Sequence, residues 1–240
     1  MTALPTRKDE AWRYSDIDAV ERLWPVPPAI VIDVPVGESV AHHILVEGGI
    51  HDFAITLGAG ARLDFHAMSW GASYGRIALD VTLHDGAHFE FGGVQIAGGT
   101  DTVEIVTTVR HIEPNATSNQ VVRSVLGGSA VGSYLGKVAV ARDAQKTDSV
   151  QSVKAMLLDR TATANAKPEL EIYADDVKCA HGATVGELDK TALFYLAARG
   201  LPPAEARTLL LQAFVAEVFT GAAAQEELEA AALAALEKLS

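Results

Sequence analysis

The chain has 240 residues, 49% hydrophobic and 21% charged, with a formal net charge of -12. This composition is typical of a globular protein with one good core, and no apolar run approaches the roughly 18–20 residues that span a bilayer. The negative charge argues against nucleic acid or an anionic membrane as partner, and a single cysteine excludes an internal disulfide and fits a reducing cytosol.

Residues 1–28 are predicted to form an N-terminal helical segment. Charges occupy positions 7–10, where a signal peptide would need an apolar core, so we expect a cytoplasmic protein. A short helix is expected between Pro5 and Trp24. It should end at the following prolines, which cannot donate a backbone hydrogen bond inside a helix.

Residues 29–186 are predicted to form a β-core, because short Val, Ile, Leu, Phe and Thr runs alternate with Gly, Asn and Asp. Residues 55–65 (ITLGAGARLDF) align with residues 81–91 (VTLHDGAHFEF) at an offset of 26 positions, from 57 to 83. Another 26 places residues 107–109 under residues 81–83, after which the repeat decays. Repeats of this length predict stacked coils, as in a β-helix. A chance match between two strands that begin near Gly-Ala is the alternative.

Residues 187–240 are predicted to form a C-terminal helical region. One helix should cover residues 189–199 and end at Gly200. Pro202 and Pro203 suit the first turn of a second helix, and Gly221 should separate a third, over residues 222–239. An apolar stripe at helical spacing follows in the second helix: Ala206, Leu209, Leu210, Ala213, Phe214 and Val218. The stripe can pack on neighbouring helices or offer a groove to a partner.

Cys179, the only cysteine, is followed two positions later by His181. In an extended strand both side chains point to the same face, and sulfur beside imidazole suits iron, copper or zinc. Burial of both residues in a core is the competing interpretation. An iron–sulfur cluster needs about four protein ligands, mostly thiolates, so this pair can hold one only together with another polypeptide. Asp175 and Asp176 are interpreted first as turn residues.

A small β-fold metalloenzyme of the cupin type is the rival interpretation. It would use histidines of the β-core: His66, His84, His88 and His111. However, His84 and His88 are separated by Asp-Gly-Ala, which is typical of a turn. The sequence contains no nucleophile elbow, no Cys-x-x-Cys, no His-Glu-x-x-His and no phosphate-binding loop, so we expect no enzymatic activity of its own.

Two stretches closely resemble the SufB/SufD family of iron–sulfur cluster assembly proteins. They are residues 5–16 (PTRKDEAWRYSD) and residues 167–186 (KPELEIYADDVKCAHGATVG), and the second is followed by FYL at 194–196 and RGL at 199–201. The low cysteine content makes the SufD branch the more similar one. The chain departs from the family in having a shorter region before its β-core.

The resemblance implies a right-handed parallel β-helix with helical ends, acting as a non-catalytic scaffold subunit. It further implies pairing with SufB, or with a second copy of the chain, through the β-helix, and docking of the SufC ATPase on the C-terminal helices. His181 would lie at the pairing interface. Cys179 would have a less secure role there, because SufB supplies the thiolate. Candidate docking residues are Phe194, Leu209, Leu210 and Phe214.

No cofactor is expected to be bound stably by the chain alone. A transient iron–sulfur cluster at the subunit interface is expected instead, with Cys179 and His181 as candidate ligands shared with the partner subunit. A purely structural solenoid is the third interpretation. Direct iron ligation, flavin binding, the oligomeric state and the number of coils stay open from the sequence.

Overall fold

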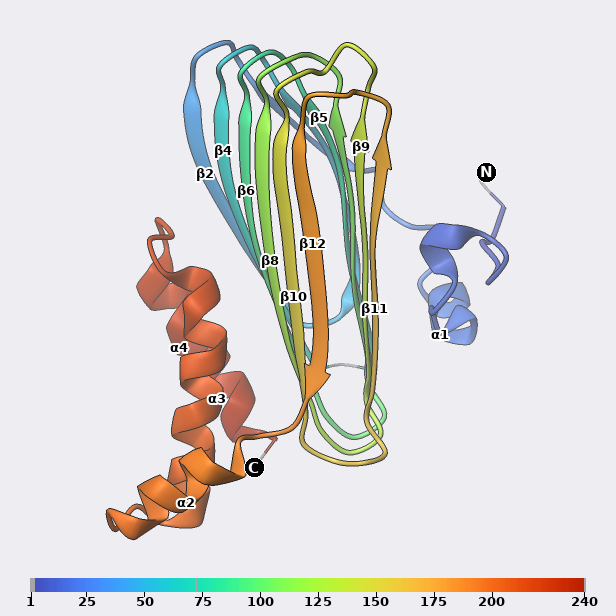
Figure 1. Cartoon of the computed structure of the whole chain (residues 1–240). Helices are drawn as coiled ribbons and strands as arrows, with labels where there is room; N and C mark the ends of the chain where they lie inside the picture. The colour runs from blue at the N-terminus through green and yellow to red at the C-terminus, as the bar shows by residue number, and fades with distance from the viewer. Residues whose placement is uncertain (1–2, 72, 240) are drawn as a thin grey trace.

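The computed structural model describes residues 3–71 and 73–239, and its core is a stack of parallel strands (Figure 1). Sheet A has the strand order β1-β3-β5-β7-β9-β11, and sheet B has the order β12-β10-β8-β6-β4-β2. Since successive strands alternate between the two sheets and all pairings are parallel, the chain winds as a β-helix. The predicted fold class is confirmed.

The strands reach nine or ten residues from β3 onward. Sheet A contains β1 (Ile30–Val34), β3 (Gly49–Leu57), β5 (Tyr74–Leu83), β7 (Thr102–His111), β9 (Val131–Val140) and β11 (Thr163–Ile172). Sheet B contains β2 (Ser39–Val46), β4 (Arg62–Trp70), β6 (His88–Ala97), β8 (Thr117–Leu126), β10 (Asp148–Leu157) and β12 (Lys178–Gly186).

The register confirms the first repeat and corrects the second. Ile55 pairs with Val81, at the predicted offset of 26. Val81 then pairs with Val109, an offset of 28, so the predicted match of residues 107–109 to residues 81–83 is wrong by two positions. The offset grows to 32 between β9 and β11, from 131 to 163. Because the strands keep their length, the connections between them absorb the extra residues and the inward faces stay aligned.

One column of inward positions between the sheets is apolar in the first coils and polar in the later ones, while the positions around it stay mostly apolar. Phe53, Phe65 and Phe91 pack there, with ring centroids 5.2 Å apart for Phe53–Phe65 and 6.3 Å apart for Phe65–Phe91. Further along, Gln120 and Gln151 occupy the corresponding inward positions and are equally buried. The chemistry of this column therefore changes along the axis of the β-helix.

The N-terminal segment contains a 3-10 turn, η1 (Glu10–Trp12), and helix α1 (Ile17–Arg22), and lies on the outer side of sheet A (Figure 1). A buried ionic cluster holds it there. Arg76 Nη1 donates to Glu104 Oε2 (2.9 Å), and Ser15 Oγ donates to the same oxygen (2.9 Å). The Arg76 guanidinium also stacks 3.9 Å from the Trp12 ring centroid. This anchor explains why a mostly polar segment is ordered on the sheet.

The C-terminal helices are α2 (Lys190–Ala198), α3 (Pro203–Phe219) and α4 (Gln225–Glu237). α3 and α4 pack on strands of sheet B, opposite the N-terminal segment (Figure 1). Buried Arg123 of β8 fixes α3 by pairing with Glu217 (3.1 Å). Across residues 3–71 and 73–239, none of the helices has the length and apolar character needed to span a membrane.

Two helix predictions need correction. α4 begins at Gln225, three residues later than predicted, since Gln225 Oε1 accepts a hydrogen bond from the Gly221 N–H and closes a turn there. The apolar stripe of α3 is also misassigned, because Leu209 and Ala213 are exposed. The residues that α3 buries are Ala206, Leu211, Val215, Val218 and Phe219. α3 packs on both sheet B and α4, so its buried face is wider than one stripe.

Candidate functional site: the open end of the β-helix

The β-helix ends at β11 and β12, where no further coil of the described chain covers its interior. Within residues 3–71 and 73–239, β11 pairs only with β9 and β12 pairs only with β10, so each leaves one edge unpaired. We call this surface the open end. Its inward-facing side chains come from both strands and are mostly apolar: Ala166, Pro168, Leu170 and Ile172 of β11, and Cys179, His181, Ala183 and Val185 of β12.

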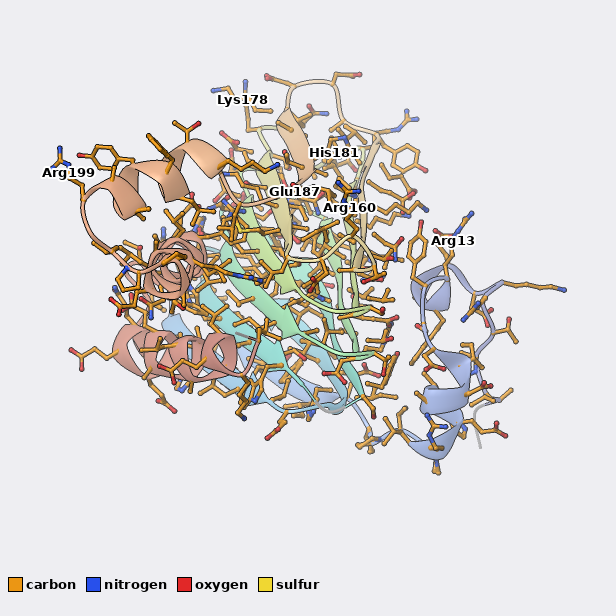
Figure 2. The ribbon with its side chains drawn as sticks, turned by 90° about the horizontal axis from the view of Figure 1, so that it is seen from below. Arg13, Arg160, Lys178, His181, Glu187 and Arg199 are labelled. Carbon is orange, nitrogen blue, oxygen red and sulfur yellow. The ribbon has the colours of Figure 1, made fainter. Side chains whose placement is uncertain are left out.

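Cys179 and His181 lie on the same face of β12, as the two-residue spacing predicts. Cys179 pairs in register with Ser149, and His181 pairs with Gln151. Both partners point into the β-helix and are buried, so Cys179 and His181 point inward too. Cys179 is half-buried and His181 is exposed, and Figure 2 shows His181 at this end of the molecule.

The environment of Cys179 favours the neutral thiol. Burial raises the pKa of Cys179, and the negative charge of Asp148 raises it further, while a hydrogen bond with the Ser149 backbone opposes the shift. Since the thiolate is the form that binds metals and attacks electrophiles, Cys179 is a weak ligand in the isolated chain. His181 is the more accessible donor of the pair.

The residues around this pair take turn and strand roles. Asp175 and Asp176 lie in the bend between β11 and β12, as predicted, and Asp176 pairs with Lys146 of the preceding coil. Gly182 lies within β12 and pairs with Ser152. Among the described residues, no group of three His, Cys, Asp or Glu side chains could hold a metal ion. The open end offers one thiol and one imidazole.

The four histidines of the metalloenzyme interpretation do not converge. His66 is buried on the outer face of sheet B beside α3, and His84 pairs with Glu113 in a turn. His88 contacts Thr117, with 2.7 Å between His88 Nδ1 and Thr117 Oγ1. His111 points into the β-helix, where burial lowers its pKa to about 4. Each histidine has a separate local environment.

The four predicted docking residues divide into two pairs. Phe194 of α2 is 74% exposed and Leu209 of α3 is 46% exposed, so both can meet a partner. Leu210 and Phe214 are half-buried, and Phe214 packs inside the molecule beneath the Arg123 guanidinium, 6.0 Å from the ring centroid. α2 buries none of its residues, and Figure 2 shows Arg199, which follows it, directed away from the β-helix.

Sequence reasoning missed several residues of these surfaces. Tyr195 is 55% exposed beside Phe194, and the Arg199 guanidinium lies 4.9 Å from its ring centroid. At the open end it missed the inward-facing β11 residues and Val185. Extending the period-2 rule from Cys179 to Val185 would have found the latter.

Comparison with known proteins gives one family model and several relatives. The model, described as "SUF system FeS cluster assembly, SufBD core domain", matches residues 49–214. An iron–sulfur cluster assembly SufBD family protein of Synechocystis is 35% identical over 166 residues, 69% of this chain and 37% of that protein. Iron–sulfur cluster assembly protein SufD of Escherichia coli is 38% identical over 112 residues, 47% of this chain and 26% of that protein. The chain spans 37% or less of the length of these two relatives.

Proposed function

Because the chain belongs to the SufBD core family of the SUF system, we propose that it is a non-catalytic scaffold subunit in iron–sulfur cluster assembly. The observation that carries this proposal is the open end, where inward-facing apolar side chains and two unpaired strand edges surround His181 and Cys179. Uncovered edges of this kind are templates for pairing with another chain.

The partner at the open end is SufB, or a second copy of this chain. A strand of the partner pairs with β12 or β11, and its side chains cover Ile172 and Val185, which the isolated chain leaves exposed. This burial supplies the apolar contribution to association, while the backbone hydrogen bonds of the edge fix the register.

The cluster is the cargo of this interface. One imidazole and one thiol are too few to hold it, since iron–sulfur clusters need about four protein ligands. The partner therefore supplies the remaining thiolates. Exposed His181 contributes the first ligand from this side, and Cys179, whose pKa is raised by burial, contributes less.

SufC docks on the C-terminal helices. The exposed residues Phe194, Tyr195 and Leu209 supply apolar contacts there. A pull on these helices is transmitted to the β-helix, because α3 is tied to sheet B by the Arg123–Glu217 pair. ATP-driven closure of two SufC subunits can thereby strain the stacked core, whose coils contact mainly their neighbours.

The test is His181→Ala in the chain co-produced with SufB and SufC, followed by iron and sulfide analysis of the purified complex. We expect the complex to assemble normally and the cluster content to fall severalfold, since a ligand is lost without disturbing the fold. His84→Ala is the matched control, because it removes a histidine from a turn distant from the open end. Unchanged cluster content in His181→Ala would remove His181 from the mechanism.

A further inference from the structure

A column of polar side chains runs through the β-helix and ends at His181. The parallel register places Gln120 of β8 beside Gln151 of β10, and Gln151 beside His181 of β12. All three point inward, and both glutamines are buried. His181 is therefore the outermost member of a column whose inner members are amides.

Two hydroxyl groups from sheet A fix the inner part of this column. Tyr134 Oη donates to Gln120 Oε1 (3.2 Å), and Thr107 Oγ1 donates to the same oxygen (2.7 Å). Gly136 leaves the space for this arrangement, because a Cβ at that position would lie 2.2 Å from Tyr134 Oη. Since the Tyr134 proton is used on Gln120, its oxygen can accept a further hydrogen bond.

Gln151 supplies that hydrogen bond and is thereby oriented. Its Nε2 donates to Tyr134 Oη (3.2 Å), which leaves its Oε1 on the other side of the amide. This oxygen is buried and has no hydrogen-bond partner among the described residues, and Gln151 is only 1% exposed. An unpaired buried acceptor is destabilising, and the register places two donors beside it: Gln120 Nε2, which is also unpaired among the described residues, and the imidazole of His181.

We propose that Gln151 is a positioning residue for His181, and that its Oε1 accepts a hydrogen bond from an imidazole N–H of His181. The bond fixes one tautomer and turns the other ring nitrogen, with its lone pair, toward the partner. Histidines that bind metals commonly donate their second ring N–H to a carbonyl or carboxylate in this way. This inference rests on the proposed function only for the use made of His181.

The first test measures the imidazole itself, in the isolated folded chain and without any cluster. The ring ¹⁵N chemical shifts of His181 are recorded by NMR at a pH where histidine is neutral, with the signals assigned by their loss in His181→Ala. We expect shifts of one hydrogen-bonded tautomer, and a change to those of a free exposed histidine in Gln151→Leu. Unchanged shifts in Gln151→Leu would overturn the proposal.

Gln95→Leu is the matched control. Gln95 is another buried glutamine of sheet B, and it hydrogen-bonds the Val103 and Ser133 carbonyls outside the His181 column. We expect Gln95→Leu to leave the His181 chemical shifts unchanged. A change equal to that in Gln151→Leu would contradict the proposal, because it would show that loss of any buried glutamine disturbs His181 through a less rigid core. Tyr134→Phe is a second variant that keeps the amide but frees its orientation. It should give a mixture of tautomers even if Gln151→Leu does not fold, and a single unaltered tautomer in it would contradict the proposal.

A second measurement separates this inference from the proposed function. In the complex with SufB and SufC, Gln151→Leu should lower cluster content by about tenfold, the lower end of the effects seen on removing a partner of a metal-binding histidine. If His181→Ala leaves cluster content unchanged, the proposed function fails while the NMR result stands. If the His181 chemical shifts are the same in Gln151→Leu and the parent chain, the positioning role is wrong whatever the cluster content.

Discussion

The two ends of the β-helix are built from the same kind of coil, but one column of inward positions is filled differently at each end. At the first end, the His42 ring lies over phenylalanines, with 5.0 Å between the His42 and Phe65 centroids, and burial lowers the pKa of His42. At the last end, His181 lies over Gln151, and the hydroxyl of Tyr134 supports that amide. A histidine that lies over aromatic rings contributes to packing. A histidine that lies over an oriented amide also has an acceptor for its ring N–H.

One column of inward positions runs between these ends, and its side chains change from aromatic to amide along the way. In register it contains His42, Phe65, Phe91, Gln120, Gln151 and His181. The fold requires only that each position be filled and satisfied. Apolar filling at one end therefore carries stability, and polar filling at the other is available for function.

The largest expected effect comes from breaking the apolar part of the column. Phe65→Ala should lower the free energy of unfolding by about 3–5 kcal/mol, because a fully buried ring leaves a cavity among Phe53 and Phe91. Gln151→Ala should cost less, about 1–3 kcal/mol, since it mainly leaves polar groups unpaired. Urea denaturation of both variants measures the difference.

Val31→Ala on the exposed surface of β1 is the control, and it should stay within about 0.5 kcal/mol of the parent chain. A loss for Gln151→Ala equal to that for Phe65→Ala would show that the two ends do not differ in this way.

A buried histidine of β7 should also make the stability of the protein sensitive to acid. His111 points inward and is hydrogen-bonded to Ser118 (3.0 Å), and burial lowers its pKa to about 4. In the unfolded chain its pKa is about 6.5, so between these values only the unfolded state binds the proton. The free energy of unfolding is therefore highest above pH 6.5. It decreases as the pH falls toward 4, by up to roughly 3 kcal/mol at about 1.4 kcal/mol per pKa unit.

His111→Asn should flatten this part of the pH dependence of unfolding, measured by urea denaturation at several pH values. Identical slopes for His111→Asn and the parent chain would contradict the assignment.

The sequence alone could predict the features that depend on short-range spacing, namely the repeat of the coils and the alternation of side chains along a strand. The alignment of residues 55–65 with residues 81–91 predicted the coil, and the spacing of Cys179 and His181 predicted their shared face. The offsets between later coils could not be predicted from the sequence, because the turns lengthen without a pattern. Only the strand pairing in the structure shows which residues are register partners. The open end is likewise a property of the whole stack, since Val185 is exposed because no further coil of the described residues covers it.

The buried pair of Arg76 and Glu104 is intermediate between the features that the sequence could predict and those that it could not. The two residues are register partners on adjacent coils, 28 positions apart, so a corrected repeat would have brought them together. The buried face of α3 was beyond reach, because it is set jointly by sheet B and α4. Local spacing could not show which apolar residues of α3, such as Leu209 and Leu211, face these neighbours.

The most direct test of the account compares one valine at each end of sheet B. Val40 of β2 and Val185 of β12 both face inward on edge strands and are 38% and 47% exposed. We expect Val185→Lys to weaken association with SufB by at least about tenfold, or 1.4 kcal/mol, because pairing would bury an unpaired charge. Val40→Lys should bind SufB like the parent chain, as measured by sedimentation and co-purification. The reverse result, with binding lost only in Val40→Lys, would contradict assembly at the open end.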